Sequence, residues 1–65
     1  MDNKELGRLC KAYRERLCKT QADVAADVGY SKETVSAFET GRNNNAIIFC
    51  WYVRHGFKLE VYDGK

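Results

Sequence analysis

The feature that most constrains the fold of this chain is a set of glycine and hydroxyl residues that mark where helices begin and end. Gly29 and Ser31 stand two residues apart. Glycine ends a helix in the left-handed conformation at the least cost, and serine is a preferred N-cap. One helix is therefore expected to end at Gly29 and another to begin after Ser31. Thr20 is a second N-cap candidate and Gly41 a second stop, so both helices are short.

Two further helices are predicted on either side of this pair. Glu5 follows Asp2 by three positions, the spacing of a capping box, and apolar residues recur at helical intervals over residues 3–17. Residues 46–53 read AIIFCWYV after an asparagine-rich loop, and they predict a helix that is apolar on every side, with a strand as the alternative. The residues expected to face inward from the two short helices are Ala22, Val24, Ala25, Val28, Val35 and Phe38.

The C-terminal part of the chain indicates a dimer. A helix apolar on every side must be covered on every side, and a chain of 65 residues buries only ~60% of its extended surface. Apolar and polar residues then alternate over residues 57–62, as in a half-buried strand for which the sequence offers no partner strand. We expect this strand to pair across a homodimer; the alternative is a core helix with exposed aromatic residues. The expected dimerisation residues are Ile47, Trp51, Phe57, Leu59 and Val61.

The cysteines do not favour a metal or a disulfide. Cys10, Cys18 and Cys50 form no Cys-x-x-Cys pair, and a zinc site would need all three together with His55, the single histidine. An odd count without a secretion signal also disfavours a disulfide. We interpret the cysteines as small buried hydrophobic residues, Cys10 and Cys50 in particular, with thiol sensing as the open alternative. No metal or cofactor is expected.

Composition narrows the class of protein further. The start of the chain lacks the apolar run of a signal peptide, and its longest apolar stretch, eight residues, is far shorter than the ~20 that span a membrane. We expect a cytoplasmic protein without a membrane partner. With one histidine, no phosphate-binding glycine loop and too little chain to enclose a substrate pocket, an enzyme is not expected.

The helix after Ser31 is expected to present a face that can enter a DNA groove. At about 100° per residue, Val35 and Phe38 point to one side. The opposite side carries small or hydrogen-bonding side chains, which a major groove can accommodate. Two short helices around a tight turn are the ingredients of a helix-turn-helix.

The segments TQADVA (residues 20–25), VGYS (28–31) and VSAFETGR (35–42) resemble the Cro/phage-repressor (Xre-like) helix-turn-helix family. The resemblance covers about residues 3–56. It implies an all-α, four- to five-helix repressor-like DNA-binding domain over residues 1–56, and residues 57–65 are then a C-terminal strand or tail for dimerisation. The DNA-binding positions that the resemblance and the helix face indicate are Gln21, Ser31, Lys32, Glu33, Ser36, Ala37, Thr40, Arg42, Asn43 and Asn44.

The resemblance also implies an ion pair, and the sequence departs from the family pattern at several positions. Arg14 and Glu39 match positions that form a structural ion pair in some family members. If exposed, the pair would contribute roughly 0–1 kcal/mol; if buried, removal of one partner would leave the other charge unpaired and cost ~3–5 kcal/mol. Cys18 and Lys19 stand where glycine and an apolar residue are common, no proline follows the recognition helix, and a predicted strand replaces the fifth helix. Glu33 brings a negative charge to the expected reading end.

Charge is unevenly distributed along the chain. Residues 21–40 hold one lysine and four acidic residues, a net charge of −3, whereas residues 1–20 carry +3. Few basic residues per subunit allow few phosphate contacts, which favours two subunits that bind double-stranded DNA together. Their two recognition helices, ~34 Å apart, would read a palindromic operator. We therefore expect a homodimeric, sequence-specific DNA-binding regulator that acts as a repressor, as the resemblance implies; the alternative is an antitoxin or other adaptor that binds a toxin or another regulatory protein.

Overall fold

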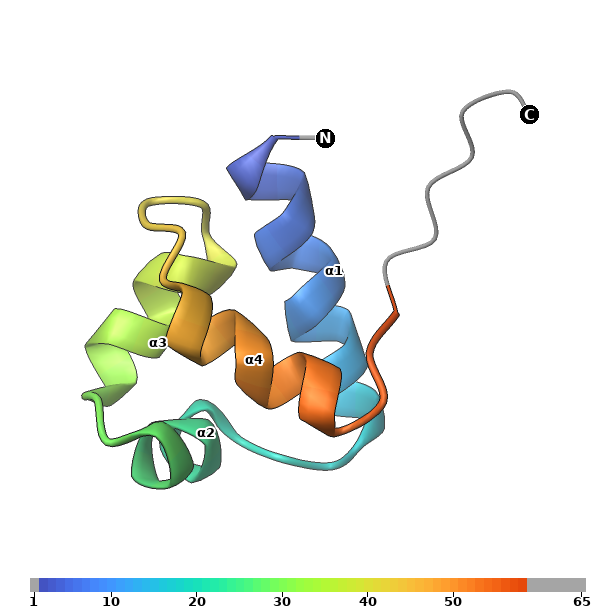
Figure 1. Ribbon diagram of the computed structural model, residues 1–65, viewed down its shortest axis with the longest axis vertical. Helices are drawn as coiled ribbons and strands as arrows, with labels where there is room; N and C mark the ends of the chain where they lie inside the picture. The colour runs from blue at the N-terminus through green and yellow to red at the C-terminus, as the bar shows by residue number, and fades with distance from the viewer. Residues whose placement is uncertain (1, 59–65) are drawn as a thin grey trace.

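The computed structural model describes residues 2–58, which form four helices (Figure 1): α1 (Asn3–Arg16), α2 (Gln21–Val28), α3 (Lys32–Glu39) and α4 (Ala46–Arg54). α3 packs against both α1 and α2, and α4 packs against α1 and α2. The all-α prediction with four helices is confirmed for the described residues, which contain no strand. Phe57 and Lys58 are not in a strand, and the rest of the predicted strand, with Leu59 and Val61, lies outside the described residues.

Each helix begins at a polar residue, and the caps of the first three are the ones that the sequence predicts. The Asp2 side chain accepts a hydrogen bond from the Glu5 amide, which caps α1. Thr20 and Asp23 form a reciprocal capping box at α2, with distances of 3.1 and 2.8 Å. Ser31 caps α3, and Asn45 caps α4. These side chains satisfy amides that have no partner inside the helix, so each helix start is fixed by local sequence.

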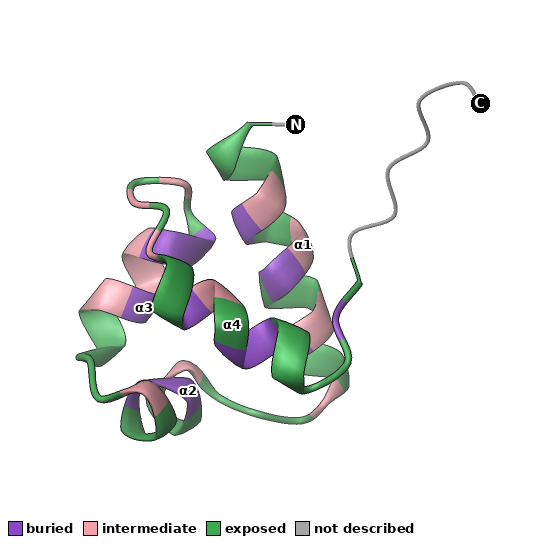
Figure 2. Cartoon of the chain, viewed as in Figure 1, coloured by how far each residue is buried: buried purple, intermediate pink, exposed green. Residues whose placement is uncertain are grey.

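The core lies where the inner faces of the four helices meet. α4 contributes Ile48, Trp51 and Tyr52, which are fully buried, and Tyr52 stacks on Phe38 of α3 at a centroid distance of 5.7 Å. Buried and exposed residues alternate along α4 (Figure 2). The buried apolar residues are Cys10, Val24, Ala25, Val35, Phe38, Ile48, Trp51, Tyr52 and Phe57.

The expectation that Trp51 and Phe57 lie at a dimer surface is wrong for both residues. Trp51 is covered by its own chain, and its indole N–H donates to the Asp27 carboxylate at 2.8 Å. Phe57 folds back on the core and packs edge-on against Tyr13, with ring centroids 5.6 Å apart. The Tyr13 hydroxyl also donates to the His55 carbonyl at 2.5 Å, which fastens α1 to the end of α4. One chain therefore covers the inner side of the apolar helix, and Phe57 helps it to do so by packing against Phe49.

Three other burial predictions are wrong. Ala22 is exposed at the start of α2, Cys18 is exposed between α1 and α2, and Cys50 is exposed on the outer side of α4. The three cysteines are free, and only Cys10 is buried. Burial, together with the nearby Glu39 charge, raises the pKa of the Cys10 thiol to about 12, so this thiol stays protonated and unreactive.

A close approach between two helix backbones fixes the position of α3. A Cβ placed on Gly7 of α1 would lie 2.5 Å from the backbone oxygen of Glu39 and 2.6 Å from that of Phe38. Only glycine leaves room for this contact, which the sequence analysis did not anticipate. None of the helices within residues 2–58 has both the length and the apolar character needed to cross a bilayer.

Candidate nucleic-acid interface

α2 and α3 are joined by a tight turn at Gly29. Gly29 ends α2 with φ of 81°, in the left-handed region, and nothing lies within 4 Å of where its Cβ would be. Glycine is therefore needed here for its backbone angle rather than for space. Ser31 follows at once and caps α3. The chain thus forms the helix-turn-helix that the sequence predicts.

The outer side of α3 is small and polar. Lys32 and Glu33 are exposed at its first turn, and Ser36 and Ala37 are half-buried on the same side. Thr40 is exposed directly after the helix, and its hydroxyl donates to the carbonyl oxygens of the last turn, 3.0 Å away at Ser36. The structure therefore brings these five predicted residues to one surface, on which Lys32, Glu33 and Thr40 are exposed.

A buried carboxylate connects α3 to the other three helices. Glu39 accepts two hydrogen bonds from the Arg14 guanidinium, at 2.8 and 3.0 Å, so the ion pair expected between them is present and buried. The same carboxylate accepts from the Gln21 amide at 3.0 Å and from the Tyr52 hydroxyl at 2.5 Å. Arg14 lies on α1, Gln21 on α2 and Tyr52 on α4. We call these four residues the Glu39 network; it holds the recognition helix in a fixed orientation.

The Glu39 network keeps its carboxylate ionised. Burial raises the pKa of Glu39, but the hydrogen bonds from Arg14, Tyr52 and Gln21 together outweigh burial and hold the pKa below its ordinary value. Burial and the bond to Glu39 raise the pKa of the Tyr52 hydroxyl, so Tyr52 remains a donor. A buried charge is tolerated when all its lone pairs are satisfied, as they are here.

Gln21 has a different position from the one the resemblance implies. Its amide N–H₂ group donates inward to Glu39, so it fastens the start of α2 to α3. Around it lies a surface hollow between α1, α2 and α3, and its lining residues are Lys11, Arg14, Thr20, Gln21, Ala22 and Lys32. The hollow combines a helix N-terminus with lysines from two other helices, a combination suited to an anion such as phosphate.

The loop between α3 and α4 is held by its own side chains. Asn43 donates to the Thr34 carbonyl at 3.4 Å and accepts from the Asn45 amide at 3.1 Å, so it braces the loop. Arg42 and Asn44 are exposed. Among the predicted loop residues, Arg42 and Asn44 are therefore the two whose side chains can reach a ligand.

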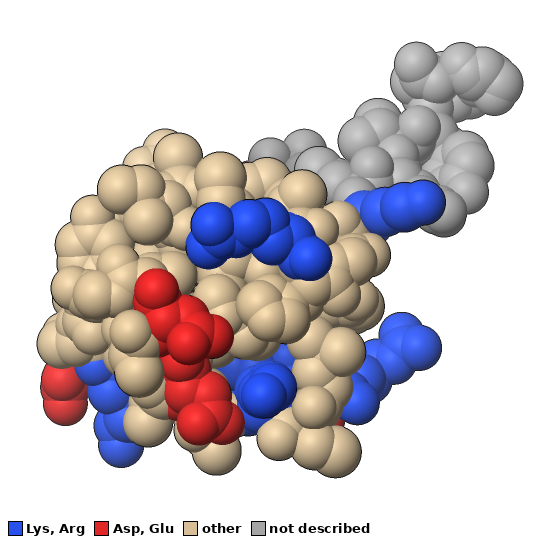
Figure 3. Space-filling model, turned by 60° about the horizontal axis from the view of Figure 1, so that its bottom comes forward, with Lys and Arg blue, Asp and Glu red and all other residues tan. Residues whose placement is uncertain are grey.

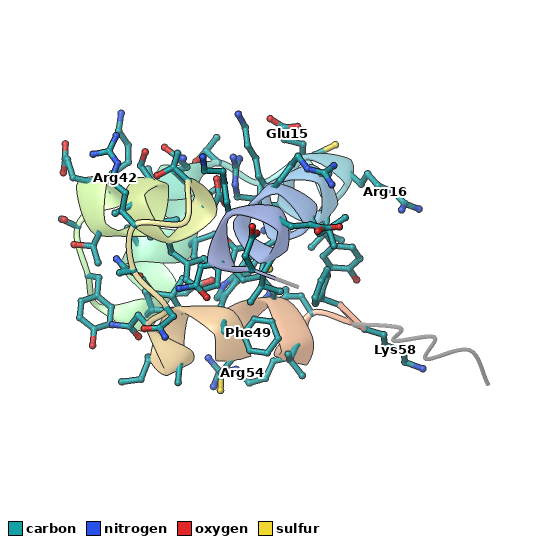
Figure 4. The ribbon with its side chains drawn as sticks, turned by 90° about the horizontal axis from the view of Figure 1, so that it is seen from above. Glu15, Arg16, Arg42, Phe49, Arg54 and Lys58 are labelled. Atoms are coloured by element: carbon teal, nitrogen blue, oxygen red, sulfur yellow. The ribbon has the colours of Figure 1, made fainter. Side chains whose placement is uncertain are left out.

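The candidate interface lies on one side of the domain. Arg42 lies on one side and α4, with Phe49 and Arg54, on the opposite side (Figure 4). Acidic side chains gather in a group flanked by basic ones when the α2 side is brought forward (Figure 3). Within residues 2–58 no three His, Cys, Asp or Glu side chains are placed to hold a metal ion.

Comparison with known families agrees with this geometry. The model of a helix-turn-helix domain family matches residues 5–46, which span most of α1, all of α2 and α3, and the first residue of α4. The chain therefore belongs to this helix-turn-helix domain family, a class of DNA-binding domains. No curated protein and no solved structure matches the chain.

Sequence reasoning missed two members of the Glu39 network. The sequence analysis places Tyr52 only within the apolar run of residues 46–53 and Gln21 only among the predicted DNA-binding positions. A tyrosine hydroxyl inside an apolar helix was the available signal, because such a group needs a partner when it is buried. Its partner could not be identified without knowing how α4 crosses α3.

Proposed function

We propose that this protein is a transcriptional regulator of the Cro/phage-repressor (Xre-like) type, which binds a palindromic operator as a homodimer and acts as a repressor. The observation that carries the proposal is the Glu39 network. It holds α3 against α1, α2 and α4 and leaves a small polar side of α3 facing outward. A rigidly positioned helix of this kind can place its side chains against base edges with a fixed register.

Roles follow from the position of each side chain. Lys32 can donate to guanine acceptors in the major groove, and Glu33 can accept from the cytosine amino group. Ser36 and Ala37 are small enough to allow close approach of the helix to the bases. Arg42 and Asn44 in the loop, and the hollow around Gln21, would contact backbone phosphates.

The outer side of α4 supports a dimer. Ile47 and Val53 are 54% and 46% exposed, and Cys50 between them is also exposed. These residues lie on the helix that faces away from Arg42, so a duplex bound on the Arg42 side leaves them accessible to a second copy. Leu59 and Val61 remain a prediction for the same interface that the described residues do not test.

The test is a selection of duplexes from a random library by the purified full chain, followed by titration at fixed salt. We expect a palindromic sequence that binds roughly a thousandfold more tightly than a scrambled duplex. Lys32→Gln should reduce this preference on the order of tenfold or more, whereas Lys58→Gln, an equal change of charge outside the interface, should not. Equal affinity for selected and scrambled duplexes would contradict the proposal. Copurification of an unrelated protein on α4, in place of a second copy, would favour the antitoxin alternative.

A further inference from the structure

α1 carries a row of basic side chains that neither the turn nor the recognition helix accounts for. Lys4, Arg8 and Lys11 are all exposed. At about 100° per residue, these three and Glu15 fall within about 60° of one another around the helix. Glu15 lies on the same side of the domain as Arg42, opposite α4 (Figure 4). The row therefore faces the Arg42 side.

Both ends of this row meet the interface described above. At one end, the Lys4 backbone packs against Gly41, whose Cβ would lie 2.6 Å from the Lys4 Cα, and Gly41 directly precedes Arg42. At the other end, Lys11 lines the same hollow as Gln21 and Lys32. The row thus runs alongside α3 from the loop to the start of α2.

A second hollow lies between the row and the end of α3. It is lined by residues of both helices, namely Asp2, Lys4, Glu5, Arg8, Lys11, Glu39 and Thr40. The acidic side chains nearby are not tightly paired with the row. Asp2 accepts from the Glu5 amide as a cap, Glu39 is buried in its own network, and Glu5 approaches Arg8 only loosely, at 3.9 Å. Glu15 lies one turn beyond Lys11 on the same face and forms no ion pair with it within residues 2–58. An exposed pair of this kind is weak, so a phosphate can replace it.

The charge of the helix-turn-helix makes such a row necessary for tight binding. Lys32 is the single basic residue among residues 21–40, which hold four acidic ones. Phosphate contacts supply much of the affinity of DNA-binding proteins, and each one requires a cation or an amide donor. An acidic recognition unit therefore gains affinity from positive charge on neighbouring elements; Arg42 in the following loop supplies one such charge, and α1, which packs against α3, supplies more.

We propose that Lys4, Arg8 and Lys11 form a phosphate-binding track that contacts the DNA backbone next to α3. This inference rests on the proposed function and adds to it a set of contacts outside the helix-turn-helix. The track binds backbone phosphate without reading bases, so it contributes equally to operator and non-operator duplexes.

The experiment compares two triple variants of the full chain with equal loss of charge. K4Q/R8Q/K11Q removes the track, and R16Q/R54Q/K58Q removes three cations elsewhere; all six residues are exposed, and circular dichroism checks that both variants remain folded. Affinity for the selected duplex and for a scrambled one is measured by fluorescence anisotropy over a series of salt concentrations. The slope of log affinity against log salt changes by about 0.9 for each phosphate contact.

We expect the track variant to reduce the slope by about 2–3 and to weaken binding to both duplexes by the same factor. The control variant should keep the wild-type slope, and R8K should keep it as well because it retains the charge. An unchanged slope in the track variant, or an equal decrease in the control, would overturn the inference. Failure of the wild type to distinguish the two duplexes would instead overturn the proposed function, so the two failures are separable.

Discussion

Tyr52 of α4 donates its hydroxyl hydrogen to Glu39 of α3, and the same carboxylate is held by two hydrogen bonds from Arg14 of α1. One carboxylate thus joins three helices, and Gln21 adds the fourth. This arrangement relates stability to function, because the groups that hold the fold together also set the orientation of the recognition helix.

Replacing the carboxylate should be strongly destabilising. Glu39→Gln leaves the Arg14 charge buried without a counter-charge, and we expect a loss of ~3–5 kcal/mol in the free energy of unfolding. Tyr52→Phe removes one donor and should cost less, about 1–3 kcal/mol. Urea denaturation measures both. Glu33→Gln, at an exposed site, is the matched control and should change stability little; an equal effect at Glu33 would argue against the network.

The network also predicts acid sensitivity. Because the folded-state pKa of Glu39 is depressed, its contribution to stability is fully present above the ordinary glutamate pKa and is lost as pH falls through the folded value. Stability measured from pH 7 to pH 3 should therefore decline more steeply in the wild type than in Glu39→Gln. Asp23, whose pKa is lowered by hydrogen bonds from Thr20, accounts for part of the dependence that remains in the variant. Parallel pH profiles would contradict this account.

Cys18 should be replaceable with a gain in stability. It is the one non-glycine residue with positive φ within residues 2–58, at 60°, in the turn between α1 and α2. A non-glycine residue in this conformation costs roughly 1–2 kcal/mol. Glycine avoids this cost, but it loses more conformational entropy on folding, which offsets part of the gain. Cys18→Gly should thus raise the free energy of unfolding by about 0.5–1 kcal/mol. Cys50→Ala, at an exposed helical site, serves as the control for loss of a thiol, and a decrease for Cys18→Gly would show that the side chain has another role.

Gly7→Ala should destabilise the protein although alanine favours helices. The gain in helix propensity is about 1 kcal/mol, but the new methyl group would lie 2.5 Å from the Glu39 backbone oxygen and must force α1 away from α3. We expect a net loss of about 1–3 kcal/mol by thermal or urea denaturation. Gly29→Ala, with no neighbour within 4 Å, reports the cost of the backbone angle alone. Wild-type stability for Gly7→Ala would mean that the two helices can separate freely.

The proposed dimer has its own test on α4. Ile47→Asp places a charge in the exposed apolar side of this helix and should shift the sedimentation equilibrium of the full chain from dimer to monomer without unfolding it. Ala12→Asp, at an exposed site on α1, should leave the association unchanged. A wild-type chain that stays monomeric at high concentration would contradict the dimer, and the core position of Trp51 is compatible with either result.

The sequence predicted local features well and tertiary ones poorly. Helix boundaries depend on neighbouring residues, so Thr20, Ser31 and Gly29 were sufficient to place them. Burial of Trp51 and Phe57 depends on how α4 crosses the other helices and how the chain folds back, which no local pattern encodes. The Arg14–Glu39 pair could be expected only through the family resemblance.

The most direct test of the central claim is an NMR titration of the full chain with the selected duplex, recording backbone amide shifts for each residue. We predict that the largest changes fall on residues 32–37 of α3, on Gln21 and on Arg42, while the core residues of α4 change little. Changes concentrated on the exposed side of α4, or absent from residues 32–37, would contradict the account.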